Sequence, residues 1–373
     1  MLNSQRWLGI AFVGCFLGAI CIAGSSLAAT IEPAITDHCN ITLDGRLEPG
    51  DAARLEAVID SAPERLAKRA DHEIPRKDIC LNSAGGSFPE ALKIVELLTR
   101  RASEWGSIGT VVDRGAECFA ACAYVFMAGR FHAFHGLTFP LRQMHVNGTV
   151  GFHLPETREP TGLQDKKVVE SAYTEAVRHI AFLMKQNSGV ETGFDHNRPY
   201  PKSLTGAALS LKPGDTLLID TVDKAGKWNI TLLGVPKMDP SSITDKKLRT
   251  ACGNYLRWRE KPTGSTEPAA SDLPPKFSNR MHRTTFKGFG AKSDEYCVVD
   301  LYDSAAQGPL INLEHRTTLK AKKGEYVSTP ASIKQFFDEG GGDFGQYGIL
   351  GEPLWAMFEQ QSRISDLAGL MQR

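Results

Sequence analysis

The stretch that most constrains the fold of this chain runs from Asp78 to Leu98 and reads D-I-C-L-N-S-A-G-G-S-F-P-E-A-L-K-I-V-E-L-L. It begins with apolar residues typical of a short buried strand, and from Ala91 apolar residues recur at helical spacing. Gly85 and Gly86 lie between the two patterns and permit backbone angles that a side chain would forbid. One interpretation is that such a turn binds an anion, either a phosphate group or the oxyanion of a reaction intermediate. The other is that the turn needs glycine for its backbone geometry alone.

The start of the helix carries its own signals. Ser87 is a good N-cap residue, and Glu90 follows three residues later, which is the spacing of a capping box. Pro89 falls in the first turn, where a missing N–H costs little. We therefore expect a strand, a glycine turn and a capped amphipathic helix in this order.

The first residues have the pattern of a secretory signal. Arg6 precedes an apolar run from Trp7 to Ile22, and small residues follow up to Ala29. The sequence predicts that residues 1–29 are a signal peptide and that the mature protein is periplasmic or secreted. The alternative is a protein anchored in the inner membrane by an uncleaved signal, because the weakly polar stretch nearly reaches spanning length.

The charge balance excludes some partners. Lys plus Arg and Asp plus Glu both number 43, so no global field points to nucleic acid or to an anionic membrane. We expect no nucleic-acid partner, and no membrane partner once the signal is cleaved.

Six of the 8 cysteines remain after the predicted signal: Cys39, Cys80, Cys118, Cys122, Cys252 and Cys297. An even number in an exported protein indicates disulfides. Cys252 and Cys297 bracket one region near the C-terminus and form the natural pair there. The pairing of the other four is left open.

The order of patterns predicts a layered α/β fold. Strand patterns at residues 39–46, 79–81 and 108–112 alternate with helical patterns that start near Asp51, near Ser87 and within Gly115–Gly129. A charged connection is expected at 64–77, a hairpin turn at Asn147-Gly148, and an amphipathic helix at 163–186. We place one domain at 30–238 and a small C-terminal domain of unknown role at 239–373, with a linker at 261–276.

Three motifs resemble the proteolytic subunit of Clp protease and, more broadly, the Clp-protease/crotonase-like superfamily, in particular an exported bacterial branch of it. They are Leu81–Ser87 (L-N-S-A-G-G-S), Cys118–Gly129 (C-F-A-A-C-A-Y-V-F-M-A-G) and Gly151–Pro155 (G-F-H-L-P). The resemblance covers residues 39–233. It implies a Clp-protease/crotonase-like layered fold followed by a small disulfide-bearing C-terminal region.

The resemblance also implies roles for single residues. It gives Gly85, Gly86 and Ala121 an oxyanion or binding role, and His153 the role of general base. The position of the family's nucleophilic serine falls on Ala120, which has no hydroxyl group and cannot attack a carbonyl.

Other residues enter as weaker candidates. Cys118 lies near a helix start, where the pKa of a thiol is lowered, so it is a candidate substitute nucleophile. Asp195 is a candidate for orienting His153. The histidines at 132, 135, 145 and 153 lack nearby ligands that would complete a metal set, so we expect neither a metal nor a cofactor.

Two functional classes compete most directly. The one we favour is a periplasmic pseudoenzyme that binds a peptide or protein in place of cleaving it. The alternative is an active hydrolase or crotonase-type enzyme that uses the Gly85-Gly86 loop and His153, with or without a cysteine as its nucleophile. A third class is a structural component of an assembly, since both parent families work as rings or trimers. The resemblance therefore leaves a homo-oligomer as one of the expected states of this protein.

The signal-peptide prediction can be tested by mass. The intact mature protein purified from the periplasm should begin at Ala29 or Thr30. A full-length species that remains in the membrane fraction would contradict the prediction.

Overall fold

The computed structural model describes residues 28–69, 72–105, 107–132, 138–153, 166–187, 199–212, 214–236, 238, 242–258, 269–270, 276–278, 281–287, 296–304, 308–316 and 353–371. Among these residues no helix is long and apolar enough to cross a membrane. The predicted signal peptide, apart from Ala28 and Ala29, lies outside them.

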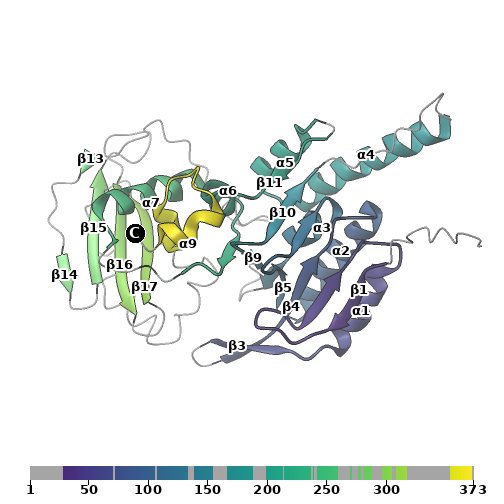
Figure 1. Cartoon of the computed structure of the whole chain (residues 1–373), viewed down its shortest axis with the longest axis horizontal. Helices are drawn as coiled ribbons and strands as arrows, with labels where there is room; N and C mark the ends of the chain where they lie inside the picture. The colour runs from purple at the N-terminus through teal and green to yellow at the C-terminus, as the bar shows by residue number, and fades with distance from the viewer. Residues whose placement is uncertain are drawn as a thin grey trace, which may run out of the picture.

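A central sheet of nine strands organises the first part of the chain (Figure 1). Its strand order is β1-β2-β4-β5-β7-β8, with β3 paired to β4, and β9 paired to both β5 and β12. The strands are β1 (Thr30–Pro33), β2 (Ile41–Asp44), β3 (Arg65–Arg69), β4 (His72–Asn82), β5 (Ser107–Val112), β7 (Arg130–His132), β8 (Thr138–Pro140), β9 (Arg142–His145) and β12 (Thr231–Leu233). Strands β2, β4, β5, β9 and β12 run parallel, so their carboxyl ends meet at one edge.

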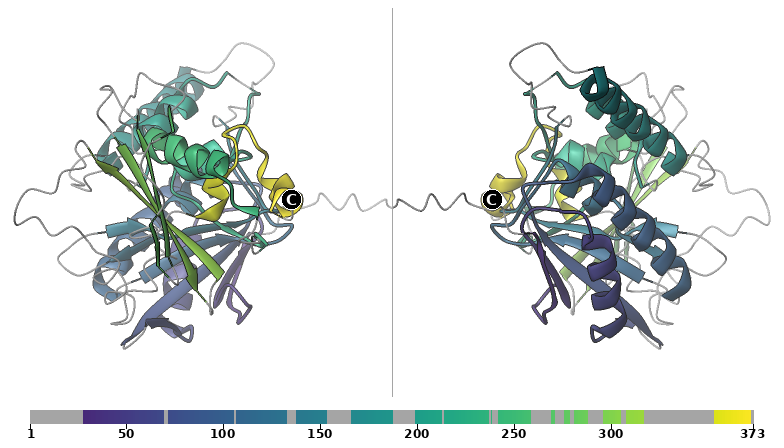
Figure 2. Two further views of the ribbon diagram at one scale, coloured as in Figure 1. Left: turned by 90° about the vertical axis from the view of Figure 1, so that its left-hand side faces the viewer. Right: turned by 90° about the vertical axis from the view of Figure 1, so that its right-hand side faces the viewer.

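A smaller sheet and six helices complete this layer arrangement. The smaller sheet has the order β11-β10-β6, and its β6 and β10 run parallel. Its strands are β6 (Glu117–Phe119), β10 (Thr149–Phe152) and β11 (Leu217–Leu218). The helices are α1 (Asp51–Ser61), α2 (Phe88–Trp105), α3 (Ala121–Met127), α4 (Lys166–Asn187), α5 (Lys202–Leu209) and α6 (Val222–Lys227). Helices α1 and α2 lie side by side on one face of the central sheet (Figure 2).

The C-terminal region has its own sheet of five strands, against which α7 packs. Its elements are α7 (Asp245–Trp258), β13 (Ala269–Ala270), β14 (Lys276–Ser278), β15 (Met281–Lys287), β16 (Tyr296–Ser304), β17 (Gly308–Arg316), η5 (Leu354–Met357), η6 (Ile364–Asp366) and α9 (Leu367–Leu370). The expected Cys252–Cys297 disulfide joins α7 to β16. The layered α/β fold with a disulfide-bearing C-terminal region is therefore confirmed.

The C-terminal region shares one continuous hydrophobic core with the first domain. The Trp258 ring occupies the space where a side chain at Gly226 would stand, so α6 and α7 approach closely there. The N–H of Ile364 also donates to the carbonyl of Asp220, at 3.0 Å. The residues placed at 239–373 are thus packed firmly against the domain that precedes them.

Several local predictions were wrong in instructive ways. The charged connection at 64–77 is largely a hairpin of β3 and the start of β4. The turn at Asn147-Gly148 joins β9 and β10, which belong to different sheets, so it closes no hairpin.

In the predicted capping box, Ser87 Oγ accepts from the Glu90 N–H at 3.4 Å, but the Glu90 carboxylate accepts from the Ala52 N–H at 2.8 Å. Glu90 therefore caps α1, the neighbouring helix.

The described part of the chain begins with Ala28 and Ala29, and Ala28 pairs with Arg46. Ala29 is fully buried against Gly45, and its N–H donates to the carbonyl of Arg46 at 2.9 Å. A mature chain that starts at Ala29 keeps this contact, whereas one that starts at Thr30 loses it.

A buried arginine ties distant segments together. Arg142 is 1% exposed, and its guanidinium donates to the carbonyls of Met127, Pro199, Trp228 and Asn229. Met127 ends α3 and Trp228 directly follows α6, so two helix C-termini direct partial negative charge at the cation. Burial lowers the pKa of Arg142 to about 9, which still leaves it charged at neutral pH.

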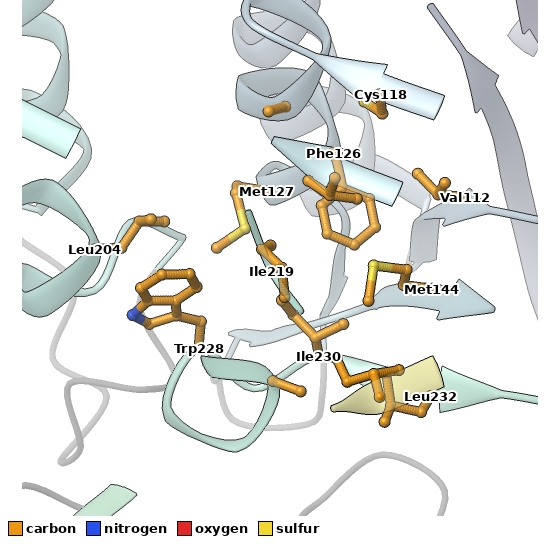
Figure 3. Close-up of a cluster of buried hydrophobic side chains, with 14 of the residues drawn as sticks. Val112, Cys118, Phe126, Met127, Met144, Leu204, Ile219, Trp228, Ile230 and Leu232 are labelled. Atoms are coloured by element: carbon orange, nitrogen blue, oxygen red, sulfur yellow. The ribbon is translucent and has the colours of Figure 1, made fainter. Parts of the chain in front are cut away.

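Apolar side chains from the segments that Arg142 joins belong to one buried cluster, shown in Figure 3. Phe126 and Met127 of α3 lie there with Met144 of β9, Trp228 and Ile230, and all five are buried. Burying a charge next to such a cluster is tolerated because main-chain oxygens surround the guanidinium.

Replacing Arg142 should therefore be costly. In Arg142→Met the carbonyls lose their donor inside the core, and each buried unsatisfied group costs about 1–3 kcal/mol, so we expect a loss of at least about 3 kcal/mol in the free energy of unfolding. The matched control is Arg46→Met, because Arg46 is 54% exposed and its ion pair with Glu48 contributes little. Urea unfolding compares the two, and equal stabilities would contradict this role.

Candidate functional site

The candidate site centres on a sharp turn between β6 and α3. Ala120 has φ 50° and ψ −118°, a conformation that residues other than glycine rarely adopt. Its N–H donates to the carbonyl of Gly151 at 2.9 Å, and its carbonyl accepts from the N–H of Ala123 at 3.0 Å. A strained residue at a strand-to-helix turn is the geometry with which α/β-hydrolases present a nucleophilic serine. In this chain the residue at the turn is Ala120, whose side chain is a methyl group.

The expected helix at Gly115–Gly129 is shorter than predicted because its first part pairs as a strand. The Ser83 N–H donates to the Glu117 carbonyl at 2.6 Å, and the Phe119 N–H donates to the Ser83 carbonyl at 2.9 Å. On the other side β6 pairs with β10. This tertiary pairing overrides the apolar pattern, and the helix begins only after Ala120.

The glycine loop lies directly against this turn. A Cβ on Gly85 would stand 2.9 Å from the Cβ of Ala120 and 3.6 Å from the nitrogen of Ala121. A Cβ on Gly86 would overlap the backbone of Leu47. Both glycines have positive φ, 108° and 136°, so close approach and backbone conformation each require glycine.

Ser83 holds the loop in place and was not singled out from the sequence. Its Oγ accepts from the Gly85 N–H at 3.2 Å and lies 3.1 Å from the Gly85 carbonyl oxygen, to which it donates. A serine two residues before a glycine pair is typical of a side chain that bonds to the following turn, and this signal was present in L-N-S-A-G-G-S. The Gly85 N–H is therefore occupied by the protein itself.

The main-chain N–H groups of Gly86 and Ala121 differ from that of Gly85 because the protein does not occupy them in the same way. Among the described residues no acceptor lies within hydrogen-bond reach of the N–H of Gly86 or of Ala121. Ala121 is the first residue of α3, where main-chain N–H groups have no partner inside the helix. The loop and the helix start thus each have one main-chain N–H group that the described part of the protein does not use.

The structure brings His153 to the same edge. His153 directly follows β10, Ala120 directly follows β6, and the two strands run parallel with Gly151 opposite Phe119. The residues that follow neighbouring parallel strands emerge at the same edge of a sheet, so Ala120 and His153 lie on the same side of the fold. His153 is half-buried.

Aromatic side chains connect the three segments of the site. The ring of Tyr124 makes edge-to-face contacts with Phe88 at 5.2 Å and with Phe152 at 5.4 Å between centroids. Phe88 begins α2 after the glycine loop, and Phe152 directly precedes His153. The Tyr200 hydroxyl donates to the Tyr124 carbonyl at 2.6 Å. Burial raises the pKa of Tyr124, so this tyrosine stays neutral and serves packing.

Cys118 cannot act as the substitute nucleophile. It forms a disulfide with Cys122, and the two residues are 0% and 1% exposed. The bond spans Ala120 and joins β6 to the first turn of α3. Because the sulfur of Cys118 is in this bond, Cys118 has no free thiol that could act as a nucleophile. Cys39 and Cys80 form the third disulfide, between the start of the fold and β4.

The sequence also named Asp195 and several further histidines. Asp195 and His135 lie outside the described residues. Within the described part of the chain, no group of three His, Cys, Asp or Glu residues is placed to hold a metal ion.

A second polar group lies at the carboxyl ends of β5 and β9. The Nδ1 of His38 is 3.3 Å from a carboxylate oxygen of Asp113, and the Nδ1 of His145 accepts from the Asn147 N–H at 3.0 Å. Burial lowers the pKa of His145, and the charge of Arg114 lowers it further. His145 is therefore bound as a neutral ring that fixes the turn before β10.

No protein-family model matches this chain, and no curated protein matches it. Solved structures that are similar to it include a peptidase from Plasmodium falciparum (9% identity, 50% of this chain, 90% of that chain, TM-score 0.30). Others are the ClpP protease catalytic domain from Plasmodium falciparum (13%, 52% and 85%, TM-score 0.29) and a ClpP1 mutant from Listeria monocytogenes (12%, 52% and 89%, TM-score 0.31). Likeness at this level says nothing about activity.

The contact between loop and turn can be tested with matched glycine substitutions. Gly85 and Gly50 have nearly equal φ, 108° and 103°, but no atom lies within 4 Å of a Cβ at Gly50. Both Gly85→Ala and Gly50→Ala incur the left-handed strain of about 1–2 kcal/mol. Gly85→Ala should lose about 1–3 kcal/mol more, because its methyl group meets Ala120. Chemical unfolding measures the difference, and equal losses would argue against the contact.

Proposed function

We propose that this protein is an exported, Clp-protease-like pseudoenzyme that binds a peptide or an unfolded protein segment and does not cleave it. The observation that carries the proposal is Ala120, which occupies the strained strand-to-helix turn where a nucleophile would stand. The disulfide of Cys118 and Cys122 removes the nearest thiols as substitutes. A base without a nucleophile gives little covalent catalysis.

The main-chain donors support binding at this place. Two main-chain donors, the N–H of Ala121 directly after Ala120 and the N–H of Gly86 in the loop that contacts Ala120 through Gly85, are of the kind that binds a carbonyl or carboxylate oxygen of an extended peptide. Because Ala120 offers no hydroxyl, an oxygen of the ligand meets donors and no attacking group. His153, at the same edge, adds a polar side chain that can donate to the ligand or accept from it.

The export of the protein is part of the same proposal. The N-terminal apolar run and the even number of cysteines after it support a periplasmic or secreted location. Three disulfides persist in an oxidising compartment and rarely in the cytosol.

A second function is a crotonase-type enzyme, in which donors at a turn stabilise the enolate of a thioester and no serine is needed. The observation in its favour is that the N–H groups of Gly86 and Ala121 have no acceptor among the described residues. It requires a base near the thioester, for which His153 is the candidate. Turnover of an acyl-coenzyme A by the mature wild-type protein, lost in His153→Ala, would favour this function over binding.

The nucleophile position is tested by restoring the hydroxyl. The wild-type protein should bind fluorescein-labelled casein in a polarisation assay without cleaving it and should not react with a fluorophosphonate. Ala120→Ser adds one oxygen at the turn and should gain weak fluorophosphonate labelling, which His153→Ala in that background should remove.

The control is Ala123→Ser, which adds the same hydroxyl one helical turn away on a buried part of α3. It should leave labelling absent, and circular dichroism should show that each variant is folded. Cleavage of casein by the wild-type protein, or its labelling at another serine, would contradict the proposal.

A further inference from the structure

His145 makes a hydrogen bond that only its neutral ring can make. The residue ends β9 and is 4% exposed, and its Nδ1 accepts from the Asn147 N–H at 3.0 Å. Because a main-chain N–H can only donate, Nδ1 carries no proton here and the ring hydrogen is on Nε2. A charged imidazolium donates from both nitrogens, so a proton on Nδ1 would set two donors against each other.

The ring of His145 is enclosed on its other side by the end of β12. A Cβ on Gly234, which directly follows β12, would overlap Nε2 and stand 2.8 Å from both ring carbons beside it. The next residue, Val146, is buried, and its N–H donates to the carbonyl of Leu233 at 2.9 Å. The ring therefore lies between β12 and the turn at Asn147.

The charged groups around the ring do not favour a cation there on balance. Burial lowers the pKa of His145, and the charges of Arg114, which follows β5, and of His38, before β2, lower it further. The Asp113 carboxylate opposes these effects, but it is already engaged by His38 Nδ1 at 3.3 Å and by the Arg114 N–H at 2.7 Å. On the side of β12 the ring meets Gly234, which brings no charge.

The turn that His145 holds is tied to the starts of both β6 and β10. The Asn147 carbonyl accepts from the N–H of Gly115, at 3.1 Å, in the turn before β6. The Thr149 N–H, at the start of β10, donates to the carbonyl of Ala116 at 3.0 Å. Release of Asn147 by His145 would therefore loosen the anchor of both strands.

We propose that the hydrogen bond between His145 Nδ1 and the Asn147 N–H is an acid-sensitive latch, whose protonation releases this turn and loosens β6 and β10. When a proton binds, the bond is lost and a buried positive charge takes its place, so an open, hydrated turn is favoured. The two strands end directly before Ala120 and His153, so the latch controls how firmly these residues are held. The consequence for a bound peptide rests on the proposed function, whereas the release of the turn does not.

The direction of the pH effect follows from proton linkage. In an open turn the hydrated ring of His145 takes up a proton near the usual pKa of histidine, about 6.5. In the closed turn the pKa of the ring is lower. The open form therefore binds more protons below about pH 6.5, and the closed turn loses stability as the pH falls through that range. Above it both forms are neutral and the latch is closed.

Hydrogen exchange of the full mature protein, measured by mass spectrometry at pH 7.5 and pH 5.0, tests the latch. After correction for intrinsic exchange rates, the protection of the amides at 146–152 should fall about tenfold or more at pH 5.0, since one unit of pKa difference corresponds to a factor of ten. Helix α1, which packs on α2 and β1, is the internal reference and should change by less than about threefold.

Matched substitutions separate the latch from a general effect of acid. His145→Asn offers an oxygen that can accept the Asn147 N–H and cannot be charged, so the protection at the two pH values should agree within about threefold. His38→Asn removes the neighbouring histidine, whose ring is bonded to Asp113 and not to the turn, and should keep the tenfold loss. His145→Gln is the second uncharged variant if His145→Asn does not fold.

A measurement on the wild-type ring covers the case in which neither variant folds. Nitrogen NMR of the ¹⁵N-histidine protein should show Nδ1 of His145, identified by its coupling to the Asn147 N–H, without a proton at pH 7.5. The ring should titrate with a midpoint below about 6.5.

Four outcomes would overturn the proposal. They are a wild-type turn that keeps its protection at pH 5.0, an equal loss in His145→Asn, an acid response that His38→Asn abolishes, and a His145 ring that is already charged at pH 7.5. None of these readouts depends on peptide binding or acylation. Failure of the latch is therefore distinguishable from failure of the proposed function.

Discussion

The guanidinium of Arg142 joins three chain segments that are far apart in sequence. It donates to the carbonyl at the end of α3, to the two carbonyls that follow α6, and to the carbonyl of Pro199. Helix α3 is thus fixed at both ends, by Arg142 at Met127 and by the pairing of β6 at the start. Because α3 has only seven residues, a shift at its C-terminal end would reach the strained Ala120 at its start. The cation in the core thereby keeps the turn in its conformation.

The turn at Ala120 holds an alanine in a costly backbone conformation. Residues in such conformations cost about 1–3 kcal/mol and persist where surrounding contacts fix them. Here Gly85, the disulfide of Cys118 and Cys122, and the hydrogen bond to Gly151 supply those contacts. The N–H groups of Gly86 and Ala121 have no acceptor among the described residues, and unused main-chain donors occur in binding sites and in catalytic sites alike.

The sequence predicted those features that depend on local pattern. The alternation of strands and helices, the helix that follows Gly85-Gly86, and the Cys252–Cys297 pair could be read from spacing and composition. Features that depend on tertiary partners could not be predicted from local pattern. Glu90 caps α1 in place of its own helix, and β6 forms because Ser83 and β10 are present to pair with it.

The buried arginine and the cysteine pair at the turn also escaped sequence reasoning. Nothing in F-P-L-R-Q-M-H shows that Arg142 is buried, because its acceptors come from segments up to 87 residues away. Cys118 and Cys122 could not be paired from sequence, since six cysteines allow many combinations. Ala120 and His153 follow the neighbouring parallel strands β6 and β10, whereas Asp195 lies outside the described residues.

The disulfide of Cys118 and Cys122 also bears on when the site can exist during the life of the protein. Its two cysteines flank Ala120 and lie on different secondary-structure elements, so the bond closes a ring of five residues around the turn. While both cysteines are reduced, the strained turn is held by non-covalent contacts alone. Oxidising conditions of the kind found outside the cytosol then complete it. A newly made chain would therefore carry a turn held by non-covalent contacts alone, and it would acquire the covalently closed turn only once it meets oxidising conditions.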